Sequence, residues 1–178
     1  MLLEKTRPYF RVLARETECH LTIAQLPIKI RLDRIDQLND GSLFLMDYKT
    51  GLNSINGWFQ ERLTDPQLPL YAAFQDHSQQ SFTGMCFAEI RQGEMKFKGV
   101  VHEDHIYAQN NFSGLIPINR IKATDDIYSW NALIDTWKKS LEKLANDFCN
   151  GVAIADPVKA EVCLTCDLKP ICRYTICH

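Results

Sequence analysis

Apolar and polar residues alternate along the first third of the chain, which predicts an antiparallel β-hairpin over 28–51. Asn39-Asp40-Gly41 interrupts the alternation, and a three-residue loop with glycine in its left-handed third position commonly joins two such strands. In that register, residues whose numbers sum to 80 face each other. One face of the hairpin is then apolar and is expected to form a layer of the core: Ile28, Ile30, Leu32, Phe44, Met46 and Tyr48.

The opposite face of this hairpin gathers charge. Asp33 is expected to face Asp47, and Lys49 lies on the same face as Asp47. Facing carboxylates repel each other, and a buried charge is costly unless it is paired or bound to a metal. Mg²⁺ binds one or two carboxylates and fills its shell with water and substrate phosphate, while a lysine beside it stabilises negative charge. A metal site and a surface ion pair both fit this pattern.

The remaining pattern predicts an α/β domain with a central mixed β-sheet flanked by helices. Alternation predicts further strands over 10–16, 19–24, 83–90 and 95–101, which gives a sheet of five or six strands. Asp65 as the cap and Pro66 in the first turn predict a helix that continues over 67–75. We expect a loop over 107–122, and structural roles for His102 and His105.

A long helix is predicted from Thr124, the expected cap, to about Asn150, with Asp125 and Asp126 in its first turn and Gly151 after it. Apolar residues recur along it at helical spacing and are expected to face the core. This stripe consists of Trp130, Leu133, Ile134, Trp137, Leu141, Leu144 and Phe148.

The charged hairpin resembles a nuclease signature. Asp33, followed after the turn by Asp47-Tyr48-Lys49-Thr50-Gly51, resembles the PD-(D/E)XK nuclease superfamily, and within it the RecB-like and AddB-like branch. Gln67 and Tyr71, one helical turn apart, resemble the glutamine and tyrosine that follow the active site in this branch. Glu16 matches a glutamate at the end of a strand near the metal, which makes it a further candidate catalytic residue, although an exposed strand-end glutamate fits as well.

The resemblance implies a restriction-endonuclease-like core that hydrolyses DNA phosphodiester bonds. Asp33 and Asp47 would bind Mg²⁺ or Mn²⁺, and Lys49 would position water and stabilise the pentacovalent phosphate. Gln67 and Tyr71 would support the site or contact the strand. The implied partners are DNA and a helicase domain or subunit of the same recombination and repair complex. The alternative is a catalytically weak or inactive DNA-binding or Fe–S structural module of a larger repair protein.

Four cysteines lie in the last sixteen residues: Cys163, Cys166, Cys172 and Cys177. Four thiolates that include a C-x2-C pair are typical of both Fe–S clusters and structural zinc. The C-x2-C-x5-C spacing resembles the 4Fe–4S staple of AddB-type nucleases, whose fourth cysteine lies far upstream. Either Cys177 is a local fourth ligand, or the chain is a fragment that lacks upstream helices and the first ligand, which we favour. A zinc-ribbon-like adaptor rests on the same cysteines.

Composition adds bounds to these expectations. We expect residues 1–155 to form the nuclease core and 156–178 to form a Cys-rich tail that packs on it; 178 residues with 46% hydrophobic content suffice for one core. The net charge of −2 provides no basic surface, so DNA contact is expected in a local groove. The charged N-terminus and the lack of a long apolar stretch predict a cytoplasmic protein that does not contact a membrane.

Overall fold

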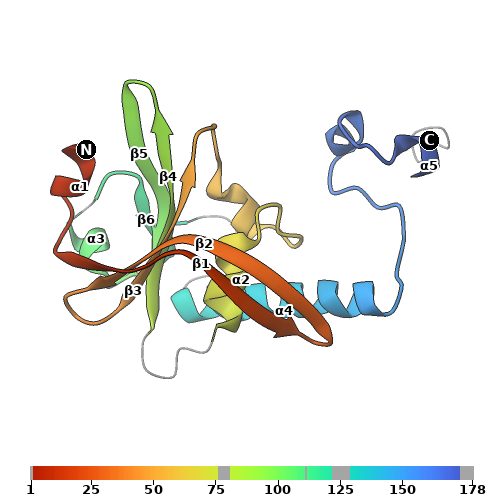
Figure 1. The fold of residues 1–178 in the computed structure, drawn as a ribbon, viewed down its shortest axis with the longest axis horizontal. Coiled ribbons are helices and arrows are strands. Elements are labelled where there is room, and N and C mark those ends of the chain that lie inside the picture. Colours follow the sequence, from red (N-terminus) through yellow and green to blue (C-terminus); the bar gives the residue numbers. More distant parts are fainter. Residues whose placement is uncertain (1, 76–80, 111, 122–128, 173–178) are drawn as a thin grey trace.

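The computed structural model describes residues 2–75, 81–110, 112–121 and 129–172 as a mixed sheet with helices packed against it (Figure 1). Six strands follow one another across the sheet in chain order: β1 (Phe10–Ile23), β2 (Leu26–Leu38), β3 (Leu43–Lys49), β4 (Phe82–Arg91), β5 (Glu94–Val101) and β6 (Leu115–Pro117). The β3–β4 and β5–β6 pairs are parallel, and the other pairs are antiparallel. The predicted α/β class with a central mixed sheet is confirmed.

Each face of the sheet carries its own apolar cluster. The helices are α1 (Leu2–Lys5), α2 (Gln67–Phe74), α3 (Ile106–Gln109), α4 (Trp130–Cys149) and α5 (Lys169–Cys172), with short 3-10 turns at Ile55–Phe59, Ile118–Arg120 and Ala160–Leu164. On one face α2 and α4 pack on Leu45 and Phe87, and the Trp137 indole donates a hydrogen bond to the Trp58 carbonyl at 2.7 Å. On the other face, α3 packs its Tyr107 against Phe44.

The β2–β3 hairpin has the predicted register, with Arg34 opposite Met46 and Asp36 opposite Phe44. The ladder ends at the first of these pairs, whereas β2 remains paired with β1 as far as its start at Leu26. The two strands therefore part from β3 and continue as a ribbon that crosses α2 and α4 (Figure 1). We call the point of separation, at Asp33, the fork.

The fork divides the apolar layer expected on the hairpin into two. Leu32 lies on the ribbon and packs in the cluster under α2 and α4, whereas Phe44 and Met46 pack on the opposite face. Tyr48 is 42% exposed. The prediction of a single layer was wrong because alternation assumes one continuous ladder. Here the β1–β2 register shifts between Val12 and Ala14, and an irregularity of this kind strengthens the twist of the strands.

Several boundaries differ from those predicted. The strands expected over 10–16 and 19–24 are one strand, β1, and the loop expected over 107–122 contains β6. The β6 strand was missed because its three residues are too few to show an alternation of apolar and polar positions. His102 and His105 are structural, as expected, because the Nδ1 atoms accept hydrogen bonds from nearby backbone N–H groups, each at 3.1 Å. Burial lowers the pKa of His105 to about 4.

The two main helices end as predicted but begin differently. Ser129 caps α4 by accepting a hydrogen bond from the Ala132 N–H at 3.2 Å, so this helix begins at Trp130. The expected cap, with the acidic residues after it, lies outside the described residues. The N-cap position of α2 is Pro66, without a side-chain cap, so Asp65 does not cap this helix.

The apolar stripe of α4 is buried as far as Leu141 and exposed beyond it. Leu133 and Trp137 are fully buried, whereas Leu144 is 56% and Phe148 is 69% exposed. The last turns of α4 extend beyond the sheet, so the prediction of a continuous core stripe was wrong at this end (Figure 1). In the described part of the chain, no helix is both long and apolar enough to cross a bilayer.

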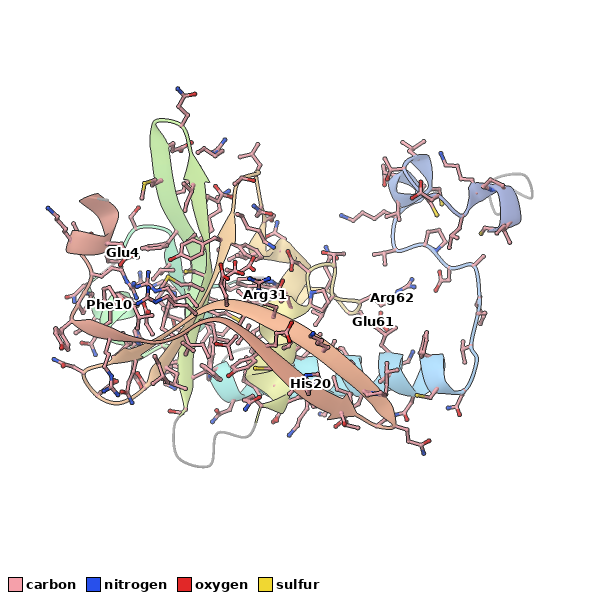
Figure 2. The ribbon with its side chains drawn as sticks, viewed as in Figure 1. Glu4, Phe10, His20, Arg31, Glu61 and Arg62 are labelled. Carbon is pink, nitrogen blue, oxygen red and sulfur yellow. The ribbon has the colours of Figure 1, made fainter. Side chains whose placement is uncertain are left out.

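The chain continues after α4 as a mostly exposed segment over 151–172. Its contact with the core includes an ion pair between Arg62 Nη2 and Asp156 Oδ2 at 3.1 Å, and the Asp156 carbonyl accepts a second hydrogen bond from the same guanidinium at 2.7 Å. Figure 2 shows Glu61 and Arg62 on the side of the core that faces this segment.

Candidate active site

Asp47 and Lys49 lie at the end of β3, on the face that α2 and α4 cover. They continue the alternation of Leu43 and Leu45, which belong to the core on that face. Asp47 is only 4% exposed, and its Oδ2 lies 2.6 Å from Lys49 Nζ. The sequence thus places a carboxylate at the end of a buried strand, and the lysine two residues later balances its charge.

Burial raises the pKa of Asp47, the Lys49 ammonium opposes this, and the neighbouring carboxylates of Asp33 and Asp65 raise it further. Burial alone would lower the pKa of Lys49, but its ion pair with Asp47 outweighs burial and the net pKa is raised. Lys49 therefore carries a positive charge at neutral pH, and the carboxylates of Asp33 and Asp65 still repel the Asp47 carboxylate.

Asp33 lies at the fork and bridges the strands where their ladder has ended. Its Oδ2 accepts a hydrogen bond from the Tyr48 N–H at 2.8 Å. Tyr48 stands between Asp47 and Lys49 in the chain, so this bond holds Asp33 beside both. The carboxylate of Asp33 takes the place that a backbone carbonyl of β2 would hold in a continuing ladder.

The segment before α2 supplies a third carboxylate. Asp65 Oδ2 lies 4.0 Å from Lys49 Nζ, and this residue was considered in the sequence only as a helix cap. Gln67 donates a hydrogen bond from Nε2 to the Arg31 carbonyl at 2.5 Å, two residues before Asp33. The start of α2 is thereby attached to β2 next to the fork.

The comparison with known families identifies the class of protein. A family model described as the PD-(D/E)XK nuclease superfamily matches residues 2–173. The chain belongs to the PD-(D/E)XK nuclease superfamily. No curated protein matches this chain. Membership implies a nucleic-acid substrate, and members of this superfamily typically use a divalent metal ion.

The donor set of the site suits such an ion. Within the described parts of the chain, no three histidine, cysteine or carboxylate side chains come together as a ready metal site. Mg²⁺ does not need such a cage, since it is usually held by one or two carboxylates, water and substrate phosphate. Asp33 and Asp47 offer two carboxylates, and the mutual repulsion that raises the pKa of Asp47 is what a divalent cation relieves.

The other predicted site residues occupy different surroundings. Tyr71 lies inside the core with its ring 5.4 Å from that of Phe82, and burial together with a hydrogen bond to Cys19 raises its pKa to about 12. Glu16 is exposed at the fork, where its Oε2 pairs with Arg31 Nη2 at 2.6 Å. Its φ of +46° is in the left-handed region, which non-glycine residues seldom adopt.

The cysteines of the tail are free thiols where they are described. Cys163 and Cys166 are half-buried and Cys172 is exposed. Cys177 lies outside the described residues. The described thiols do not form a three-ligand set, so they do not by themselves account for a cluster.

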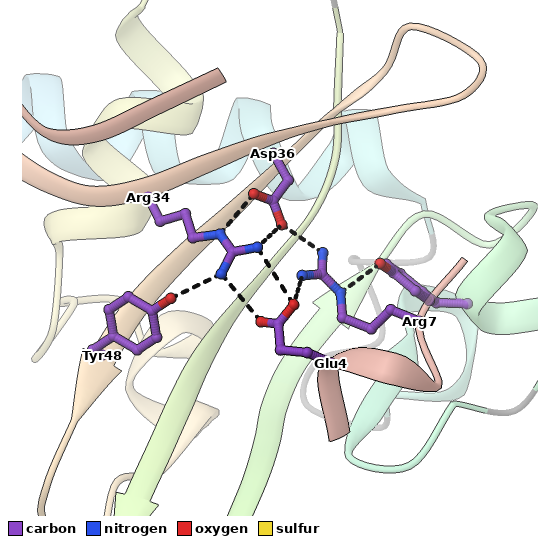
Figure 3. A network of polar contacts seen from close by, with 6 residues as sticks. Glu4, Arg7, Arg34, Asp36 and Tyr48 are labelled. Atoms are coloured by element: carbon purple, nitrogen blue, oxygen red, sulfur yellow. Dashed lines mark hydrogen bonds and ion pairs between the residues drawn. The ribbon is translucent and has the colours of Figure 1, made fainter. Parts of the chain in front are cut away.

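Sequence reasoning missed an ionic network on the other side of β3 (Figure 3). Asp36 is fully buried, and its two oxygens accept hydrogen bonds from Arg34 at 2.7 and 3.0 Å. Arg7 from the segment after α1 pairs with Asp36 at 2.7 Å and donates to the Tyr107 hydroxyl at 2.9 Å. Arg34 also donates to the Tyr48 hydroxyl at 3.0 Å, which links the network to the residue between Asp47 and Lys49.

Replacing Asp47 by Asn tests the electrostatic cost of this site. Because folding raises the pKa of Asp47 above its ordinary value of 3.8, ionisation opposes folding as the pH rises through the folded-state pKa. We expect Asp47→Asn, measured by thermal unfolding in EDTA, to raise Tm by about 2 °C at pH 7, and the gain to shrink as the pH falls toward 4. Asp65→Asn serves as the half-exposed control and should change Tm less. A lower Tm for Asp47→Asn at pH 7 would contradict the assignment.

Proposed function

We propose that this chain hydrolyses DNA phosphodiester bonds with one Mg²⁺ or Mn²⁺ ion held by Asp33 and Asp47. The observation that carries the proposal is the pairing of buried Asp47 with Lys49 at 2.6 Å, next to a second carboxylate fixed at the fork. A structural ion pair does not need that second carboxylate, which adds repulsion. In a metal-dependent site, the second carboxylate provides a further ligand for the ion.

Each residue of the site has a distinct role in this proposal. When bound, the metal ion supplies Lewis-acid stabilisation of the phosphate and lowers the pKa of a bound water. Asp33 is oriented by the Tyr48 N–H, so it meets the ion without first losing rotational freedom. The charged Lys49 ammonium donates hydrogen bonds to the attacking water and to the phosphate oxygens. Asp65, at 4.0 Å, keeps the ammonium near the site.

The remaining candidates act through position. The Gln67 side chain donates a hydrogen bond to the Arg31 carbonyl of β2, and this bond fixes the position of β2 two residues before Asp33. Tyr71 anchors α2, the helix that begins at Gln67, in the core. Glu16, exposed at the fork, is a further carboxylate that borders the substrate side of the site.

We further propose that this activity belongs to recombination and repair of DNA, with the chain acting beside a helicase domain or subunit in the manner of RecB-like nucleases. The resemblance of the Asp47–Gly51 segment and of the cysteine spacing supports this context. The alternative, a weakly active or inactive DNA-binding module, keeps the same fold and loses only metal-dependent cleavage.

Cleavage of single-stranded and duplex DNA in Mn²⁺ tests the proposal. We expect Lys49→Ala and Asp47→Asn to lower the rate by at least about 100-fold, because each removes a charge that acts directly on the reacting phosphate or its metal. Lys29→Ala provides the matched control, since Lys29 is an exposed lysine of β2 paired with Glu18. Equal rates in wild type, Lys49→Ala and Lys29→Ala would contradict the assignment, and DNA binding without cleavage would favour the alternative.

We propose that Cys163, Cys166 and Cys172 ligate a 4Fe–4S cluster, because their C-x2-C-x5-C spacing resembles that of AddB-type nucleases, with a fourth ligand from outside this motif or, as the alternative, Cys177. We expect protein purified without oxygen to be brown, to contain iron, and to lose both in Cys166→Ala, because thiolates are the cluster's ligands. Cys149→Ala is the control, since this thiol is exposed on α4 outside the motif. Zinc at one per chain without visible absorbance would indicate a zinc site instead of a cluster, and the absence of both metals would exclude metal binding by these four cysteines alone.

A further inference from the structure

A pocket of about 510 Å³ opens at the fork, between β1, β2 and β3. Its walls are formed by Val12, Arg15, Glu16, Asp33, Arg34 and Tyr48. It shares Asp33 with the proposed metal site, whereas Tyr48 and Arg34 project from the face of β3 opposite to Asp47 and Lys49, so a group bound in the pocket lies beside Asp33 and across β3 from the lysine. We propose that this pocket holds one unpaired base of a single-stranded nucleic acid, stacked on Tyr48, with Arg15 on the adjoining phosphate. The inference rests on the proposed function and names the form of its substrate.

Tyr48 has the properties of a stacking platform. Tyr48 is 42% exposed, although the residues before it in β3 are buried. Its hydroxyl accepts a hydrogen bond from Arg34 at 3.0 Å, and Arg34 is held in turn by Asp36 and by Glu4 at 3.1 Å (Figure 3). The ring is therefore oriented before any ligand arrives, which lowers the entropic cost of binding. Stacking on aromatic side chains is the usual way in which proteins bind unpaired bases.

Arg15 supplies the contact for a phosphate. It lies directly opposite Arg34 in the β1–β2 ladder, and like charges in that position repel. Arg34 is neutralised by Asp36 and Glu4, whereas no carboxylate of the described chain forms an ion pair with Arg15. An anion beside Arg15 relieves this imbalance. The phosphate that follows a base on Tyr48 is such an anion.

The shape of the pocket favours a single strand over a duplex. A base in a duplex is stacked between its neighbours and paired along its edge, so it must be extruded before it enters a concave pocket. An unpaired base enters without that cost. The pocket next to Asp33 therefore selects a strand in which the base that reaches the pocket is already free.

Binding of a fluorescein-labelled oligothymidylate to the full chain in EDTA tests this inference without relying on cleavage. Tyr48→Ala is expected to weaken binding by about 10-fold, and Tyr48→Phe, which keeps the ring, by about 3-fold or less. Arg15→Ala is expected to weaken binding and to lower the dependence of log K on log salt by about one. The controls are Tyr9→Ala, at a tyrosine that is 72% exposed, and Arg11→Ala, at an arginine bonded to Gln37, and neither should change binding.

Oligonucleotides with one abasic position, moved along the strand, locate the stacked base. At one position, the abasic strand should bind the wild-type protein about 10-fold more weakly than the complete strand does. The Tyr48→Ala variant should bind the two strands equally, because it lacks the ring on which the missing base would stack. The inference would be overturned if Tyr48→Ala bound the oligothymidylate as tightly as wild type does. It would also be overturned if Tyr48→Ala weakened the binding of duplex DNA as much as the binding of single-stranded DNA. If Asp47→Asn abolishes cleavage while Tyr48→Ala binds like wild type, the nuclease stands and the pocket falls. If binding depends on Tyr48 but the wild-type protein does not cleave DNA, the pocket stands and the proposed nuclease activity falls.

Discussion

The hydrogen bond from the Tyr48 N–H to Asp33 is the contact on which the candidate site depends. Where β2 leaves β3, the backbone N–H groups of β3 that face β2 lose their ladder partners, and the Asp33 carboxylate replaces the lost partner of the Tyr48 N–H. A carboxylate that satisfies such a group is fixed in position by the backbone. The end of the ladder thus creates the place for Asp33, and the alternation of β3 brings Asp47 and Lys49 to the same place.

The charges near β3 are divided between its two faces. On one face Asp47 and Lys49 pair beside Asp33 and Asp65, an arrangement whose surplus of carboxylates favours a cation. On the other face Asp36 is enclosed by two guanidinium groups, and its charge is fully matched. A matched buried pair adds little net stability but penalises arrangements in which one partner is missing. The first set is therefore suited to binding, and the second to holding α1 and Tyr48 in place.

Much of this arrangement could be predicted from local pattern. The hairpin register and the placement of Asp47 with Lys49 follow from alternation about Gly41, and the family signature covers the same residues. The fork does not follow, because beyond it β1 and β2 contact α2 and α4, which are distant from them in the sequence. Asp65 was taken for a helix cap because its partner, Lys49, lies in a different element. The pairing of Arg7 with Asp36 is equally non-local and carries no periodic signal.

Calorimetric titration of the chain with Mn²⁺ tests the central claim, that Asp33 and Asp47 hold one metal ion at the fork, most directly. The account predicts one ion per chain, with affinity weakened at least about 10-fold in Asp33→Asn and in Asp47→Asn, since each substitution removes one of two charged ligands. Exposed Asp156, which pairs with Arg62 in the tail, provides the control in Asp156→Asn. Mn²⁺ binding that is unchanged in Asp33→Asn and Asp47→Asn would contradict the account.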